Sequence, residues 1–212
     1  MERVYCISGL GADERLFRNL AADNCEFVPL NWVPYSESDT MSSYAGKMSA
    51  LITDRDPVVL GLSFGGMLAV EIAKQRQLKK IFIVSSAKNE RELGYRNPIF
   101  KWLVSILPGN LFAIPNGLVL HNLGAKTVEE KELLRDVIRV SDGRFMKWAL
   151  KSLLTWAGGS RPANLVQIHG TADRVIWSRN VQPDHWIAGG THIMIYNRAV
   201  EVSKIISDCL RS

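Results

Sequence analysis

The sequence predicts an α/β fold in which helices cover both faces of a mostly parallel sheet. Short apolar runs without polar alternation, typical of strands buried on both faces, are separated by segments with helical spacing of apolar residues. The 212 residues are 47% hydrophobic and 22% charged, which excludes a disordered chain and a polytopic membrane protein. A chain of this length can bury one core, so we expect a single domain over residues 1–212.

Four strands are expected in the N-terminal half because β-branched and aromatic runs recur there. They lie at residues 4–8, 26–32, 58–60 and 80–85. Pro29 lies inside the second of them and counts against a strand there, because proline cannot donate to a strand ladder. The expected helices lie between them, at residues 13–21 with Asp13 as the N-cap, at 41–52 and at 64–75.

Residues 88–162 differ from both flanks because they carry helix signals and no convincing strand. Residues 127–130 have the form of a capping box, and Asp142 is placed to cap a second helix. Strands are expected again at 165–169 and 184–188, before a last helix at 194–210. The sheet should therefore have about six strands, with a helical insertion at 88–162 over their carboxyl ends, where open α/β sheets bind ligands.

The net charge of +5 comes from this middle segment. Residues 88–161 hold 12 basic and 7 acidic side chains, and the remainder of the chain is neutral. The acids and bases are mixed along helical patterns, so we expect no nucleic-acid partner. The basic segment leaves an acidic carrier protein open as a partner, although a solvated helical face explains the charges more simply.

Two features bear on where the protein works. Residues 102–125 lack Asp, Glu, Lys and Arg, but Pro108, Pro115 and several glycines interrupt them, so we expect no membrane span. Three scattered cysteines show no pairing pattern, and the N-terminus lacks the basic and apolar regions of a signal peptide. We therefore expect a cytoplasmic protein.

Residues 61–65, GLSFG, form a G-x-S-x-G motif between an expected strand and an expected helix. A serine at such a sharp turn exposes its hydroxyl at a helix N-terminus, where the helix dipole favours developing negative charge. Small residues at 61 and 65 let the strand and the helix approach closely. The motif is short enough to arise by chance, and the alternative is an idle serine at a glycine-rich corner.

Two more candidate residues follow C-terminal strands. Asp173 ends the run IHGTAD, and His192 follows two glycines just before the last helix. Alone, each has an ordinary explanation as a turn aspartate or a capping histidine. Because parallel strands end at one edge, we expect Ser63, Asp173 and His192 to converge, with His192 as general base and Asp173 orienting its ring. Asp184 is the rival acid, and His169 fits a satisfied interior group.

Ester chemistry at Ser63 also needs hydrogen-bond donors for a developing oxyanion. We expect the backbone N–H groups of Leu10 and Phe64 to supply them, the first from the glycine-containing loop at 8–11. A plain tight turn is the alternative explanation of that loop.

In these motifs the sequence resembles the α/β-hydrolase superfamily over nearly its whole length. The runs that carry the resemblance are SGLGADERLF at 8–17, GLSFGG at 61–66, IHGTAD at 168–173 and GGTH at 189–192. The resemblance implies a three-layer α/β-hydrolase fold in which residues 88–162 form a helical lid. Two departures are Ser8, where a histidine is usual, and the absence of the antiparallel strands that often precede the first motif.

We therefore expect a serine hydrolase that cleaves a carboxylic ester or thioester through an acyl-enzyme on Ser63. An acyltransferase or lyase with the same triad, or a ligand-binding protein without turnover, are the alternatives. The apolar lid favours an apolar acyl or alcohol group, and the candidate substrate-binding residues, each of which could also serve core packing, are Trp32, Phe64, Trp102 and Trp148. Metal-ligand spacing and a dinucleotide fingerprint are missing, so we expect no metal and no cofactor.

Overall fold

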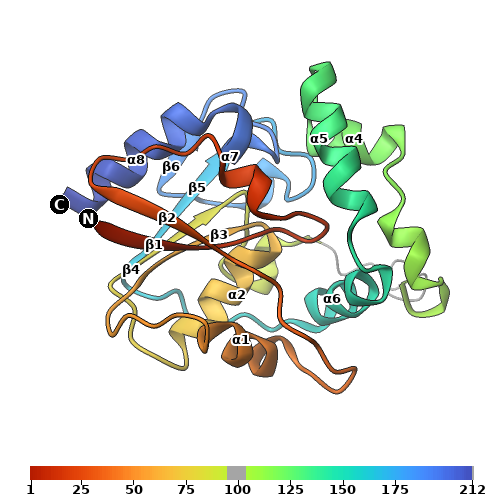
Figure 1. Ribbon diagram of the computed structural model, residues 1–212, viewed down its shortest axis with the longest axis horizontal. Helices are drawn as coiled ribbons and strands as arrows, with labels where there is room; N and C mark the ends of the chain where they lie inside the picture. Colours follow the sequence, from red (N-terminus) through yellow and green to blue (C-terminus); the bar gives the residue numbers. More distant parts are fainter. Residues whose placement is uncertain (95–103, 212) are drawn as a thin grey trace.

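The computed structural model describes residues 1–94 and 104–211, which contain one six-stranded sheet (Figure 1). The strand order is β2-β1-β3-β4-β5-β6, and every neighbouring pair is parallel. The strands are β1 (Glu2–Ile7), β2 (Cys25–Leu30), β3 (Val58–Leu62), β4 (Lys80–Val84), β5 (Leu165–Gly170) and β6 (His185–Ile187). The expected sheet of about six strands is confirmed, and Pro29 lies in the edge strand β2, where the missing donor is tolerated.

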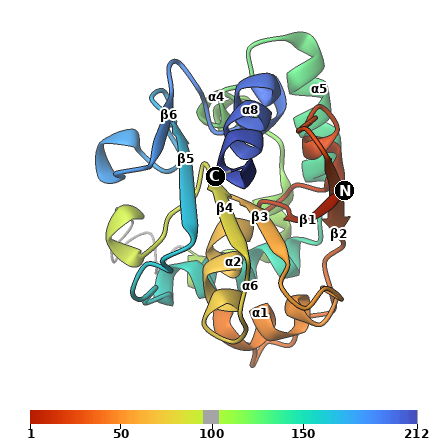
Figure 2. The ribbon, with the colours of Figure 1, turned by 90° about the vertical axis from the view of Figure 1, so that its left-hand side faces the viewer.

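Helices cover both faces of the sheet, which gives three layers (Figure 2). One face packs against α1 (Met41–Ser49), α2 (Phe64–Ala73) and α6 (Gly143–Thr155). The other packs against a 3₁₀ turn, η1 (Glu14–Phe17), and against α7 (Met194–Asn197) and α8 (Ala199–Arg211). Strand β4 shows why its run is continuously apolar, because Ile81 and Ile83 enter one core cluster and Phe82 and Val84 the other.

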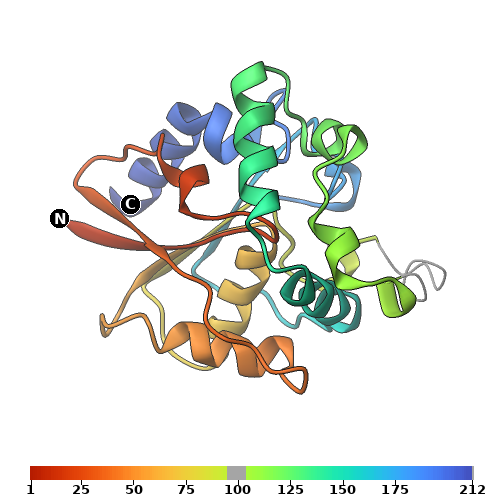
Figure 3. The same cartoon turned by 45° about the vertical axis from the view of Figure 1, so that its right-hand side comes forward.

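The described residues between β4 and β5 form helices and no strand. The helices that lie wholly within the described residues are η2 (Glu90–Glu92), η3 (Gly109–Ala113), α4 (Gly117–Leu123), α5 (Val128–Arg139) and α6. The expected capping box is present at the start of α5, where Thr127 and Glu130 satisfy each other's backbone N–H groups. Helices α4, α5 and α6 gather on the side of the molecule opposite the two termini (Figures 1 and 3).

Two expected helices differ in the structure. The helix expected at 13–21 is only the turn η1, although Asp13 caps it by accepting from the backbone N–H of Arg15. Beyond it, the N–H groups of Ala21 and Asp23 donate to the hydroxyls of Ser203 and Ser207 on α8, so tertiary hydrogen bonds replace helical ones. The last helix is interrupted at Arg198, whose backbone is not helical, and so divides into α7 and α8.

The remaining short element is η4 (Ser178–Asn180), in the connection from β5 to β6. Among the described residues, no helix combines the length and the apolar character that a membrane crossing needs.

Candidate active site

Ser63 occupies the corner between β3 and α2, as the motif predicts. Its backbone has φ +51° and ψ −117°, a left-handed conformation that costs energy for any residue with a Cβ. The surrounding backbone holds it there, since its N–H donates to the Val84 carbonyl at 3.0 Å and its own carbonyl accepts from Gly66 at 3.0 Å. The corner is therefore a sharp, strained turn that presents the serine at the start of a helix.

The glycines of the motif are required by close backbone contacts. A Cβ on Gly65 would lie 2.2 Å from the carbonyl oxygen of Ile7, in the adjacent strand β1. A Cβ on Gly61 would lie 2.4 Å from the carbonyl oxygen of Gly65. Strand and helix can meet at this angle only because both side chains are absent.

The three residues expected to converge form one chain of hydrogen bonds. Ser63 Oγ lies 2.9 Å from His192 Nε2, and His192 Nδ1 lies 2.9 Å and 3.1 Å from the two carboxylate oxygens of Asp173. Asp173 follows β5, and His192 lies on the loop between β6 and α7. Both are buried, whereas Ser63 is partly exposed. The structure thus joins side chains from three separate loops at one edge of the sheet.

Asp173 is held as a carboxylate. Burial raises the pKa of Asp173, but His192 with its hydrogen bond, His169 and the backbone N–H of Val175 together lower it more, so the net pKa lies below the ordinary value. The backbone N–H groups of Val175 and Ile176 also donate to it, at 2.8 Å and 3.1 Å. An ionised Asp173 keeps the proton of neutral His192 on Nδ1, which leaves the Nε2 lone pair facing the Ser63 hydroxyl.

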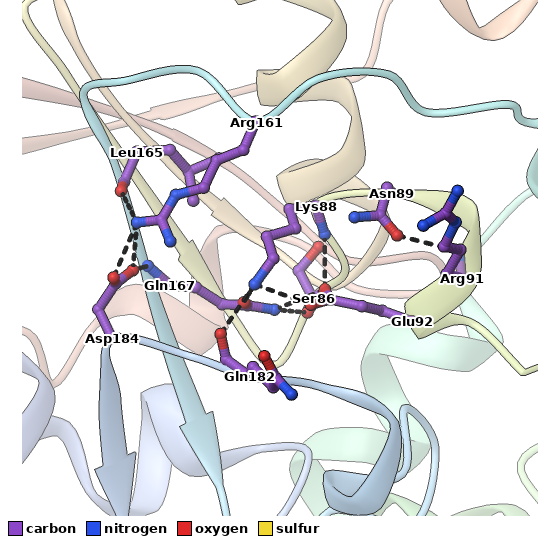
Figure 4. A network of polar contacts seen from close by, with 10 residues as sticks. All are labelled: Ser86, Lys88, Asn89, Arg91, Glu92, Arg161, Leu165, Gln167, Gln182 and Asp184. Atoms are coloured by element: carbon purple, nitrogen blue, oxygen red, sulfur yellow. Dashed lines mark hydrogen bonds and ion pairs between the residues drawn. The ribbon is translucent and has the colours of Figure 1, made fainter.

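The rival acid, Asp184, is engaged elsewhere. It forms an ion pair with Arg161 at 2.8 Å and accepts from the backbone N–H of Gln167 at 2.8 Å (Figure 4). The structure therefore pairs Asp173, and not Asp184, with His192.

His169 lies beside this chain of hydrogen bonds. The ring is fully buried on β5, with Nε2 2.9 Å from the Ile176 carbonyl oxygen and 3.6 Å from Asp173 Oδ2. Its Nδ1 has no hydrogen-bond partner among the described residues. The ring is therefore a buried neutral group that is satisfied only at Nε2, and burial lowers its pKa.

Two backbone N–H groups beside Ser63 are free to bind an oxyanion. Phe64 is the first residue of α2, where helical N–H groups lack partners, and Leu10 lies in the loop after β1. Within residues 1–94 and 104–211, neither N–H donates to a protein acceptor. The loop passes close to the serine, since a Cβ on Gly9 would lie 3.3 Å from Ser63 Cβ.

A small cavity of about 120 Å³ adjoins Ser63 and His192. Its wall is mainly apolar and comes from the Leu10 loop and from the helices between β4 and β5. From those helices it receives Phe112, Val119, Leu123, Leu134, Ile138 and Met146. The sequence shows that these residues are apolar, but only their three-dimensional arrangement places them in the cavity wall beside Ser63.

The aromatic residues expected at the substrate do not line this cavity. Trp32, Phe64 and Trp148 pack with Tyr44 and Phe145 in an aromatic cluster between α6, α1 and the α2 N-terminus, with ring centroids 4.7–6.5 Å apart. The indole N–H groups of Trp32 and Trp148 donate to backbone carbonyls, so these rings are satisfied packing elements. Trp102 lies outside the described residues.

Comparison with known proteins gives structural relatives only. No family model matches the sequence, and no curated protein matches it. A hydrolase from Oleispira antarctica superposes with a TM-score of 0.78 at 12% identity, covering 100% of this chain and 92% of that one. A lipase-esterase related protein from Clostridium acetobutylicum superposes with a TM-score of 0.71 at 15% identity, covering 98% of this chain and 93% of that one.

A third solved structure, the enol-lactonase from Burkholderia xenovorans LB400, gives a TM-score of 0.71 at 15% identity, with 100% and 92% of the two chains covered. The similarity therefore extends over at least 98% of this chain and 92–93% of each of the three solved structures. The chain has the α/β-hydrolase fold, as its sequence motifs predict.

Proposed function

We propose that the protein is a serine hydrolase that cleaves a carboxylic ester or thioester through an acyl-enzyme on Ser63. The observation that carries the proposal is the hydrogen-bonded chain from Ser63 Oγ through His192 to Asp173, at the strained corner before α2. A nucleophile, a base and a group that orients the base are the parts that this reaction needs.

In the first half of the proposed reaction, Ser63 Oγ attacks the carbonyl carbon while His192 Nε2 accepts the hydroxyl proton. The N–H groups of Leu10 and Phe64 stabilise the resulting oxyanion, and Asp173 stabilises the imidazolium. The bond to the alcohol or thiol then breaks, and His192 returns the proton to that leaving group. In the second half, water attacks the acyl carbon and loses a proton to His192. The bond between Ser63 Oγ and the acyl carbon then breaks, and His192 returns the proton to Ser63 Oγ, which releases the acid and restores the serine.

The cavity supports a short, apolar acyl group as the substrate part bound beside Ser63. A volume of about 120 Å³ is far below the roughly 300–1,000 Å³ of pockets for drug-sized ligands. Among the described residues, His192 is the only titratable side chain in its wall, so a charged acyl group would lose its hydration without compensation.

We further propose that the helices within 88–162 act as the lid of a single domain spanning 1–212. Residues of η3, α4, α5 and α6 form much of the cavity wall, so they exclude water from the region of Ser63. The protein is also proposed to be cytoplasmic, since its three scattered cysteines follow no disulfide pattern, as in a reducing compartment.

The decisive experiment compares wild type and Ser63→Ala on short-chain nitrophenyl esters and thioesters. We expect the variant to lose at least ~10⁴-fold in kcat, because the other triad members cannot replace the nucleophile. A fluorophosphonate probe should label wild type only, and peptide mapping should place the adduct on Ser63. A variant that keeps the wild-type rate excludes Ser63 as the nucleophile.

The same assay separates the alternatives. Product analysis with added alcohol or thiol distinguishes a hydrolase, which forms only the free acid, from an acyltransferase, which forms a new ester or thioester. A wild-type protein that neither labels nor turns over esters is instead a ligand-binding protein on this fold.

A further inference from the structure

Ser86 makes a contact that the proposed mechanism has not used. It is fully buried and lies just after β4, the strand that pairs with β3 in the sheet. Its hydroxyl donates to the main-chain carbonyl oxygen of Ser63 at 2.6 Å. The carbonyl also accepts from the N–H groups of Gly66 and Met67 in the first turn of α2, so the serine adds a donor outside the helix.

The carbonyl of Ser63 and the N–H of Phe64 belong to the same peptide unit. Because that unit is planar, a hydrogen bond that holds the carbonyl also fixes the direction of the N–H. Donation to the carbonyl polarises the unit and makes its N–H a stronger donor. We propose that Ser86 is a positioning residue, which orients and strengthens the Phe64 N–H as an oxyanion donor; the proposal rests on the proposed function.

The backbone around Ser86 is built to aim its hydroxyl. Ser85 has φ +48°, a left-handed conformation unusual for a residue with a Cβ, and this turns the chain after β4. Gly66 leaves the space that the hydroxyl occupies, since a Cβ there would lie 2.3 Å from Ser86 Oγ. The second glycine after Ser63 is thus required by Ser86.

A buried polar network holds Ser86 from the other side (Figure 4). Gln167, fully buried on β5, donates from Nε2 to the Ser86 carbonyl at 2.9 Å and to Glu92 at 2.9 Å. Its Oε1 accepts from Lys88 at 3.0 Å, and Lys88 is paired with Glu92 at 2.9 Å. All the polar atoms of the Gln167 amide are engaged, so the Ser86 backbone has little freedom to move.

Ser85 provides a matched control for the test. Both serines are fully buried and adjacent, but the hydroxyl of Ser85 has no hydrogen-bond partner among the described residues. Ser85→Ala and Ser86→Ala therefore remove the same atom from neighbouring sites, and only the second loses the contact with Ser63.

We expect Ser86→Ala to lower kcat roughly tenfold with KM within about twofold, because an oxyanion develops only in the transition state. The loss should stay below the ~10²–10³ that follows removal of a whole oxyanion donor. The rate of fluorophosphonate labelling should fall in parallel, and Ser85→Ala should match wild type. Wild-type kcat in Ser86→Ala, or equal losses in both variants, would overturn the proposal.

An NMR measurement separates this proposal from the proposed function. The ¹⁵N and ¹H shifts of the Phe64 amide should change in Ser86→Ala and stay constant in Ser85→Ala, with or without turnover. If wild type neither hydrolyses esters nor reacts with the probe, the proposed function fails, while the amide shift still reports on the Ser86 contact. An unchanged Phe64 amide in Ser86→Ala overturns the positioning role even in an active enzyme.

Discussion

The carboxyl edge of the sheet and the helices that cover it are built in opposite ways. At the edge, backbone meets backbone: Gly65 touches β1, and Ser63 is kept in a strained conformation by hydrogen bonds from both sides. The covering helices present apolar side chains to the cavity and meet the body through side chains, both in the apolar core and in polar pairs such as Arg18–Glu129 and Asn197–Glu130. The proposed chemistry thus lies where the structure tolerates little change, and the proposed selection of substrate lies where side chains can vary.

The largest effect on kcat should come from a substitution in the hydrogen-bonded chain at the carboxyl edge of the sheet. Asp173→Asn should lower kcat by about 10⁴, as in other Ser-His-Asp sites, because an amide N–H faces His192 Nδ1 and favours the wrong tautomer. Asp184→Asn is the matched control, since it removes an exposed ion pair with Arg161 and should keep the wild-type kcat. Steady-state kinetics on one ester measures kcat for both variants. A larger loss of kcat in Asp184→Asn than in Asp173→Asn would reverse the assignment of the acid.

The carboxyl edge should also tolerate added side-chain atoms less well than the covering helices, as judged by the free energy of unfolding. Gly65→Ala forces a Cβ to within 2.2 Å of the Ile7 carbonyl oxygen and should reduce the free energy of unfolding by about 3 kcal/mol. Gly117→Ala, at the start of α4, meets no atom within 4 Å and should stay within about 0.5 kcal/mol of wild type. Urea unfolding followed by tryptophan fluorescence measures both, and equal losses would remove the contrast between the regions.

A substitution in the covering helices should alter the choice between substrates more than it alters the rate of the proposed reaction. Met146→Ala on α6 enlarges the cavity, so the kcat/KM ratio of a hexanoyl to an acetyl ester should rise about tenfold. Lys147→Ala, the next residue on α6, lies outside that cavity and should leave the ratio unchanged. A ratio that stays constant in Met146→Ala would place the acyl group elsewhere.

The smallest expected effect concerns His169 and pH. Because burial lowers its pKa, the folded protein binds fewer protons than the unfolded chain once the pH drops below about 6.5. The free energy of unfolding should therefore fall with decreasing pH in that range, by up to ~1.4 kcal/mol per pH unit from this residue.

The variant His169→Gln tests this dependence. Gln does not titrate and retains an N–H that can donate to the Ile176 carbonyl, so its pH slope should be shallower than that of wild type. Urea unfolding between pH of about 7.5 and 5.5 compares the two slopes. An identical slope would show that His169 makes no contribution to the acid sensitivity.

Much of the edge could be predicted because its signals are local. The glycines at 61 and 65 around Ser63 are informative in the strand–turn–helix context, since only small residues permit that turn. The positions of Asp173 and His192 followed from a topological rule, that parallel strands end at one edge. The contact of Ser86 could not be read in this way, because it depends on the conformation of Ser85.

The covering helices were harder to predict, because burial alone does not specify which neighbouring residues a side chain contacts. Met146 and Trp148 are both buried on α6, two residues apart, yet one faces the cavity and the other the aromatic cluster. The expected substrate contacts of Trp32, Phe64 and Trp148 were chosen for size and apolar character, which suit packing equally well. Likewise, the helix expected at 13–21 is shorter in the structure, where the N–H of Ala21, at its expected end, donates to Ser203 on α8.

By itself, the sequence determined the order of strands and helices, the parallel sheet and the serine corner, because hydrophobic period, caps and glycine size act over a few residues. Only the tertiary structure decided which apolar residues form the cavity beside Ser63 and that the Ser86 hydroxyl donates to the Ser63 carbonyl. These depend on distances between segments far apart in the chain, which side-chain packing sets once the layers have assembled.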